Sequence, residues 1–191
     1  MAMPVLALEG CGSSGPPPTV YVLGGSDPEV PGVEPLTGRA VVEVKPVLVP
    51  DYLDVTDLLV RRAGNVVAPS QTGRWGERLS VGATRALAGT LAQRLPGVVI
   101  VTAPPAERPA RQVLVDLEVF EAQEETDVIL IGRWRLLDGA GRETLAGERV
   151  SLKEPVAGAS DTKIVAAMSR ALALFAQRVA IGVKSRLSVS G

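Results

Sequence analysis

The chain has 191 residues, the length of one folded domain with tails, and 46% of them are apolar, which is enough for a substantial core. Its 20 basic and 21 acidic side chains nearly cancel, so the chain lacks the long-range positive field of a nucleic-acid-binding protein. The sequence has no histidine and only one cysteine, which excludes histidine-dependent catalytic triads, His- or Cys-rich metal sites and an intrachain disulfide.

The single cysteine, Cys11, follows a short apolar stretch and precedes a segment of glycine, serine and proline at residues 12–18. This arrangement resembles the lipobox of bacterial lipoproteins, in which a signal peptidase cuts before the cysteine and its thiol receives a diacylglycerol. Residues 1–10 have no basic n-region, and Glu9 stands where small residues are typical, so we interpret them as a residual signal peptide. The alternative is a disordered N-terminus with an incidental cysteine. Lipidation is favoured because residues 12–18 have the composition of an extended, solvated tether.

Four elements are predicted before the first helix. Residues 19–23 predict a short strand, and a loop rich in glycine and proline follows up to residue 38. β-Branched residues over 39–49 predict a second strand, which Pro46 ends or confines to a sheet edge. Residues 50–53 form a turn, and 58–68 predict a hairpin that turns at Gly64 and Asn65.

Two helices are predicted from their apolar periodicity. Leucine and alanine recur every four residues between Trp75 and Leu95, and Pro96 follows as a stop signal. Gly82 and Gly89 each weaken this helix by roughly 1 kcal/mol relative to alanine, and we interpret them as positions where a sheet approaches closely. The second helix begins at a cap, Ser160 or Asp161. Its core-facing residues are Ile164, Met168, Ala171, Leu172, Phe175 and Val179.

The clearest strand pattern lies between these helices. Residues 98–101 predict a short strand, and alternating residues over 113–120 and 128–136 predict two long ones, with Arg133 and Arg135 on the face opposite Trp134. A further strand follows over 142–153. We therefore predict an α+β fold, with a single, mostly antiparallel sheet built as a meander of long strands and two main helices packed on one of its faces.

Three motifs could carry chemistry, but each has a simpler structural interpretation. The Gly-Ala-Gly of residues 139–141 joins two strands and does not open a helix, which indicates a hairpin turn and not a phosphate-binding loop. Residues 160–163 have the Ser-x-x-Lys spacing of a nucleophile, but they fall at a helix cap. An acidic cluster is interpreted as a solvated turn. Its members are Glu121, Glu124, Glu125 and Asp127. We expect no catalytic residue, no metal and no cofactor.

Two positions are candidates for binding a partner protein. Arg74 and Trp75 precede the first helix, and tryptophan and arginine are over-represented at interface hot spots. The simpler interpretation of Trp75 is a side chain that covers one end of the core. The same pair of interpretations applies to Tyr52, with the structural one favoured somewhat more.

Taken together, the motifs resemble the ABC-type transport auxiliary lipoproteins, also called the PqiC-like family of membrane integrity-associated transporter subunits. The resemblance covers nearly all of residues 11–185, and its specificity depends on the order of the motifs. They are the lipobox cysteine with its tether, Tyr-Val-Leu at 21–23, Val-Pro-Asp-Tyr-Leu-Asp at 49–54, Leu-Val-Arg-Arg at 59–62, Arg-Trp-Gly-Glu-Arg-Leu at 74–79 and Ala-Leu-Ala-Gly-Thr-Leu at 86–91. The short signal and Glu9 depart from the family pattern.

The resemblance implies a residual signal peptide at 1–10, a lipidated cysteine and tether at 11–18, the family domain at 19–186 and a disordered tail at 187–191. It also implies a non-enzymatic subunit of an ABC or MCE-type system that moves lipids between membranes, with MCE-domain or ABC transporter subunits as partners. Cys11 would anchor the domain at the periplasmic face of the outer membrane, which Gly12 favours because an aspartate there would be an inner-membrane retention signal. A periplasmic lipid-binding carrier and a structural lipoprotein of outer-membrane assembly are the alternatives, and a homo-oligomer is left open.

Overall fold

The structure is a computed structural model that describes residues 16–24, 39–123 and 126–187. The predicted signal peptide and Cys11 lie outside the described residues. Within these ranges, eight strands, a short 3-10 turn and two helices follow one another. Their bounds are β1 Thr19–Tyr21, β2 Ala40–Val44, the 3-10 turn Asp51–Leu53, β3 Asp57–Ala63, β4 Val66–Trp75, α1 Leu79–Arg94, β5 Val98–Val101, β6 Arg111–Gln123, β7 Asp127–Asp138, β8 Thr144–Pro155 and α2 Asp161–Leu187.

The long strand β6 organises the sheet. One of its edges pairs antiparallel with β7 along its whole length, and β7 pairs in turn with β8. The other edge is shared, because β2 pairs with the start of β6, residues 111–113, and β3 with its end, both in parallel. Strand β5 extends the sheet beyond β2, while β4 and then β1 extend it beyond β3.

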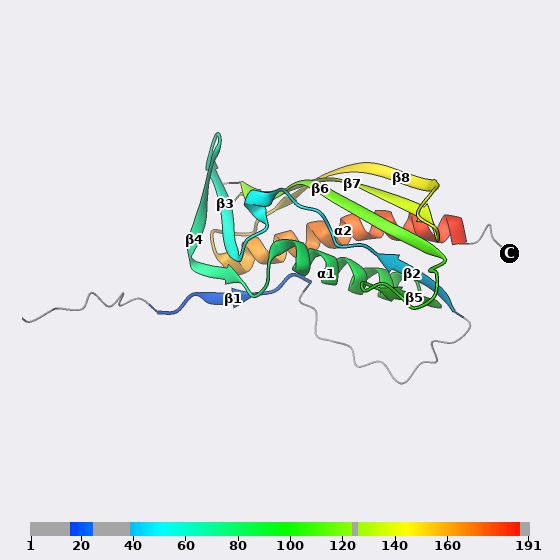
Figure 1. The fold of residues 1–191 in the computed structure, drawn as a ribbon. Coiled ribbons are helices and arrows are strands. Elements are labelled where there is room, and N and C mark those ends of the chain that lie inside the picture. The colour runs from blue at the N-terminus through cyan, green and yellow to red at the C-terminus, as the bar shows by residue number, and fades with distance from the viewer. Residues whose placement is uncertain (1–15, 25–38, 124–125, 188–191) are drawn as a thin grey trace, which may run out of the picture.

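Both helices cover the same face of the sheet, with α2 running beneath β7 and β8 and α1 packed beside it (Figure 1). By length and composition α2 could cross a membrane, but its apolar stripe is part of the core. Phe175 of α2 and Phe120 of β6 are both fully buried in this layer. Helices on one face of a sheet leave the other face available to solvent or to a partner.

The α+β class and the β6–β7–β8 meander are confirmed, and the sheet as a whole is mixed. The pairings β1–β4, β2–β5, β2–β6 and β3–β6 are parallel. The sequence predicts antiparallel pairing where two strands are joined by a short turn, because the turn residues are adjacent in the chain. Strands β2 and β3 reach β6 only through long connections, whose direction depends on tertiary packing.

A β-bulge between Leu117 and Val119 of β6 interrupts the alternation that the sequence predicts over 113–120. The extra residue at the bulge shifts all following side chains to the opposite face. Phe120 is therefore fully buried, and Val119, which unbroken alternation with the buried Leu117 would bury, is only half-buried. Opposite the bulge stands Gly132, where a Cβ would lie 2.9 Å from the Asp116 carbonyl oxygen.

Helix α1 begins at Leu79, four residues later than Trp75, the predicted start. Residues up to Trp75 instead extend β4, because their backbone pairs with β1 and with β3. The two helix glycines also differ from the prediction. A Cβ on Gly82 would contact Glu77 and Leu23, whereas a Cβ on Gly89 would have no described atom within 4 Å. Gly89 therefore faces open space and does not allow close approach of a sheet.

Candidate interaction surface

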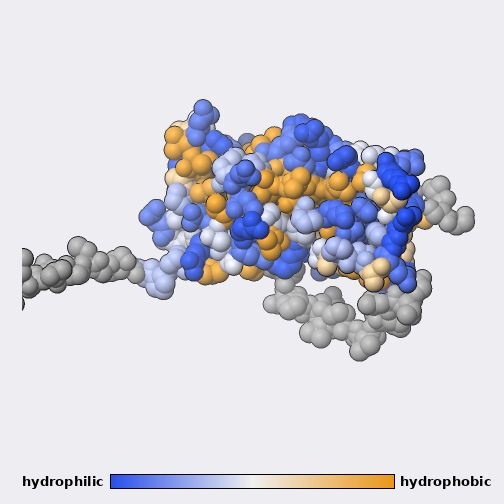
Figure 2. Space-filling model, in the orientation of Figure 1, coloured by the Kyte–Doolittle hydropathy of each residue, from blue (hydrophilic) through white to orange (hydrophobic). Residues whose placement is uncertain are grey.

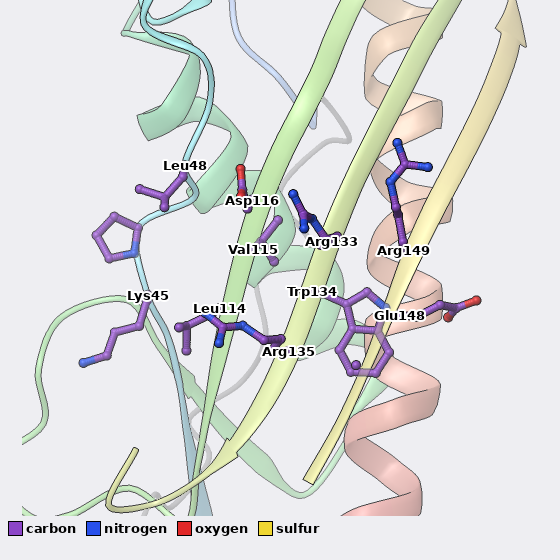
Figure 3. A pocket seen from close by; sticks show the side chains of 12 residues that line it. Lys45, Leu48, Leu114, Val115, Asp116, Arg133, Trp134, Arg135, Glu148 and Arg149 are labelled. Carbon is purple, nitrogen blue, oxygen red and sulfur yellow. The ribbon is translucent and has the colours of Figure 1, made fainter. Parts of the chain in front are cut away.

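A groove lies on the face of the sheet opposite the helices, and its volume is about 820 Å³. Residues that follow β2 form one wall, because this segment continues along the edge of β6. The amide of Leu48 donates to the Val115 carbonyl at 3.0 Å, and the Leu117 amide donates to the Leu48 carbonyl at 2.9 Å. The groove is lined by Lys45, Pro46, Leu48, Leu114, Val115, Asp116, Arg133, Trp134, Arg135, Gly147, Glu148 and Arg149 (Figure 3).

The centre of the groove is apolar. Leu48 is 63% exposed, the largest value for a bulky apolar side chain in the described part of the chain, and Leu114 of β6 lines the same groove. Apolar residues form a band across this side of the molecule in the space-filling view (Figure 2). An exposed apolar side chain on its own is ordinary, but one set in a groove between charged side chains is typical of a docking site.

Charged side chains surround this apolar centre. Glu118 lies between two arginines, with ion-pair distances of 2.7 Å to Arg133 and 2.8 Å to Arg149. The hydrogen bond from Arg149, with a further contribution from Arg133, lowers the pKa of Glu118. These three residues stand on β6, β7 and β8, so the contacts join three strands across the open face.

Arg135 differs from these arginines, because it has no ion pair with any described residue. It stands opposite Leu114 in the β6–β7 pairing, and its guanidinium extends over β6 toward Leu114 (Figure 3). Trp134, its neighbour on β7, points the other way, toward α2. The groove thus offers a partner the apolar side chain of Leu48 next to Asp116, and the positive charge of Arg135 next to Leu114 (Figure 3).

A buried ion pair lies further along the same edge of β6. Glu121 is only 3% exposed, and its carboxylate accepts bonds from the Nε and Nη2 of Arg61 on β3, the second at 3.0 Å. The hydroxyl of Tyr52 donates to Glu121 at 3.2 Å, and Gln123 donates at the same distance. Burial, together with the charge of Glu121, raises the pKa of Tyr52. Glu121 is therefore a structural anion and not part of a solvated turn, contrary to the prediction.

The segment 50–54 connects this ion pair to α1. Leu53 is buried, and Asp54 accepts a bond from the backbone amide of Ser80 at 2.9 Å and from Arg78 at 3.2 Å. Asp54 therefore satisfies an amide in the first turn of α1, where the N-cap residue Arg78 makes no side-chain cap bond. Burial alone would raise the pKa of Asp54, but the Ser80 and Arg78 interactions outweigh it and lower the pKa.

The three predicted partner-binding residues differ in how exposed they are. Tyr52 is 44% exposed beside Glu121, and Arg74 is exposed on β4 between β1 and β3. Trp75 is only 4% exposed and belongs to the core, which agrees with the simpler of its two interpretations. A partner can therefore reach Tyr52 and Arg74, but the ring of Trp75 offers little surface.

The motifs examined for chemistry have structural roles. The Asp138 carboxylate accepts backbone amides of Ala140, Arg142 and Glu143, which holds the predicted turn and lowers the pKa of Asp138. The carbonyl of Ser160 accepts bonds from the backbone amides of Lys163 and Ile164 in the first turn of α2. Within the described ranges, no group of three or more acidic, histidine or cysteine side chains could hold a metal ion.

The groove residues were not identified from the sequence. Leu48 follows Val47 in a proline-bounded stretch that reads as the end of a strand, and nothing local indicates that its side chain is exposed. Arg135 was placed on the face opposite the core, but its position near Leu114 depends on the pairing of β6 with β7. The arrangement suits contact with another macromolecule, because it presents an open, partly apolar surface.

Comparisons with known proteins agree with this architecture. A family model described as "ABC-type transport auxiliary lipoprotein component" matches residues 21–180. No curated protein matches the chain. Among solved structures, the chain is similar to an uncharacterized protein with a TM-score of 0.72 and 19% identity, over 87% of this chain and 98% of the other. It is also similar to protein XCC0632 from Xanthomonas campestris, with a TM-score of 0.66 and 14% identity, over 90% of this chain and 97% of the other. At these identities the likeness shows the fold alone.

Proposed function

This chain belongs to the family of ABC-type transport auxiliary lipoprotein components, and from that premise we propose that it docks the periplasmic component of an ABC or MCE-type lipid transport system. The family is a class of auxiliary transport components and not a class of enzymes. In this proposal Cys11 carries the lipid that holds the domain at the periplasmic face of the outer membrane. The folded part supplies the docking surface.

The observation that carries the proposal is the groove on the open face of the sheet. Leu48 offers a partner an exposed apolar side chain, and Arg135, which lines the same groove, is of a residue type enriched at interface hot spots. The ion pairs of Glu118 with Arg133 and Arg149 hold the surrounding side chains in place before a partner binds. A surface ordered in this way loses less conformational entropy on association.

The packing of the core favours docking over a lipid-binding carrier. A carrier needs an enclosed apolar cavity, whereas the described apolar residues between sheet and helices pack against one another with almost no exposure. The groove itself opens to solvent on the face away from the helices. A structural lipoprotein of outer-membrane assembly would also dock through such a surface, so the identity of the bound partner decides between these two functions.

A photocrosslinking amino acid placed at position 48 of the lipidated chain tests the docking surface in cells. We expect an adduct with an MCE-domain or ABC transporter subunit. The matched control is position 174, because Leu174 is also an exposed apolar residue, at 41%, but lies on α2. Equal adducts from both positions, or an adduct only with a protein of outer-membrane assembly, would overturn the proposal.

A second experiment tests the anchor separately. Wild type and Cys11→Ser are expressed from the full-length gene with and without an inhibitor of the lipoprotein signal peptidase. We expect the wild type to fractionate with outer membranes and the variant to be released. If the two proteins migrate and fractionate identically, Cys11 is not the anchor.

A further inference from the structure

We propose that the tip of the β3–β4 hairpin, residues 62–68, contacts the membrane surface and thereby orients the domain above its anchor. The hairpin projects from the body of the molecule at the end where α2 begins (Figure 1). Its turn falls at Gly64, whose φ of +52° is the left-handed conformation that a tight hairpin turn requires. This inference rests on the proposed lipidation of Cys11.

The tip presents apolar side chains to solvent. Val66 is 58% exposed, Ala63 beside it in the pairing is also exposed, and Val67 and Ala68 are half-buried. Apolar residues are visible on this hairpin in the space-filling view (Figure 2). The turn itself is formed by Gly64 and Asn65, and the exposed apolar residues lie directly on either side of it. The tip has an apolar surface that the core does not explain.

The tip is also held rigidly by the ion pair described above. The Nη1 of Arg61 donates to the Gly64 carbonyl at 2.9 Å, while its other nitrogens bond to buried Glu121 on β6. The turn is thereby connected to the centre of the sheet. Arg61 therefore serves the buried Glu121 and the turn carbonyl at the same time.

The position of the anchor argues for a membrane as the occupant. Strand β1 pairs with the end of β4, Thr19 beside Gly73, so the chain that leads back to Cys11 leaves the body at the base of this hairpin. Residues 11–18 span at most about 28 Å when fully extended. Helix α2 begins at this end, where Ser70 and Thr72 donate to Asp161, and its 27 residues carry the opposite end of the domain about 40 Å away. The short tether therefore keeps the hairpin end close to the bilayer.

The anchor turns a weak contact into an effective one. A few exposed small apolar side chains bind a bilayer poorly in free solution, but a tether raises their effective concentration at the surface. With the hairpin end on the membrane, the groove on the open face of the sheet stays accessible to a periplasmic partner. Orientation and docking thus use different parts of the sheet.

The single cysteine allows a test that does not depend on lipidation in the cell. The purified full chain is coupled through Cys11 to maleimide-bearing lipid in vesicles of phosphatidylethanolamine and phosphatidylglycerol, with or without brominated acyl chains. A Val66→Trp variant reports contact, because bromine quenches an indole that reaches the headgroup and acyl boundary. The matched control is Ile181→Trp, since Ile181 on α2 is also 58% exposed.

We expect Val66→Trp to lose emission in brominated vesicles and Ile181→Trp to keep it. Trp75 and Trp134, each 4% exposed, give the same background in both variants. Hydrogen exchange of the wild-type chain provides a second readout, in which amides 62–68 slow on coupling. Equal quenching of both variants, or no quenching and no slowing, would overturn the proposal. Failure of lipidation in cells would instead appear in the Cys11→Ser fractionation and would leave the vesicle result unchanged.

Discussion

Gly182→Ala tests the packing of α2 against the sheet. A Cβ on Gly182 would lie 2.1 Å from Cη2 of Trp134 and 2.9 Å from Cζ2 and Cζ3. Trp134 stands on β7, is 4% exposed, and has core residues around it. The ring cannot move away without disturbing that core, so the helix or the strand has to shift.

The expected cost follows from two opposing effects. Ordinary contact with a Cβ begins at 3.4 Å, so the ring or the helix must move by more than 1 Å. Overpacking of a core costs about 1–3 kcal/mol, and a clash of this size belongs at the upper end of that range. Alanine is favoured over glycine inside a helix by about 1 kcal/mol. We therefore expect Gly182→Ala to lower the free energy of unfolding by about 2 kcal/mol.

Gly89→Ala is the matched control, because it makes the same substitution in α1 where the added Cβ meets no described atom. Only helix propensity acts there, so we expect a gain of about 1 kcal/mol. Urea unfolding measures both variants, with unchanged m-values as the condition for comparing them. If Gly182→Ala were as stable as Gly89→Ala, the proposed contact between α2 and Trp134 would be wrong. Shortening Trp134 to leucine should remove the clash and reduce the penalty of Gly182→Ala.

Three further predictions concern the segment from Asp54 to the buried ion pair. Glu121→Ala leaves Arg61 without its buried partner and should destabilise the fold by about 3 kcal/mol in urea unfolding, since breaking such a pair costs about 3–5 kcal/mol and Arg61 is partly solvated. A loss below the error of the measurement would contradict this role of Glu121. Glu121→Gln should lower the pKa of Tyr52 toward its ordinary value of 10.0, measured by absorbance titration in a Tyr21→Phe background; an unchanged titration would show that Glu121 does not affect Tyr52. Because the pKa of Asp54 is lowered in the folded state, its contribution to stability is present above 3.8 and is lost as the pH falls through the folded value. Unfolding of Asp54→Asn should therefore depend less on pH in this acidic range than unfolding of the wild type, and identical pH dependence would argue against the cap at Ser80.

Local patterns in the sequence were sufficient for most of the elements. The alternation over 113–120 and 128–136 predicted β6 and β7, because side chains on successive strand residues face opposite sides of a sheet. The four-residue spacing of leucines predicted α1, although its first turn was placed too early. That error arose because Arg74 and Trp75 pair with β1 and β3, partners that lie far away in the sequence.

The candidate site was predictable only in part. Tyr52 was identified from its type and its motif, and it lies next to the buried ion pair. The glutamate in that pair was assigned to a solvated turn, because four acidic residues near a predicted hairpin normally face water. Its actual environment depends on Arg61, which reaches it from a strand sixty residues earlier in the chain.

The sequence by itself determined the α+β class, the meander of long strands, the membership of a lipoprotein family and the absence of histidine chemistry. These properties follow from composition, periodicity and motif order, which are local or additive along the chain. Only the tertiary structure decided that β2 and β3 share one edge of β6, and that Leu48 and Arg135 line the same groove. It also decided that β1, which follows the predicted tether, pairs with β4 at the base of the β3–β4 hairpin. Each of these depends on pairing between distant strands, and such pairing is set by how the whole core packs.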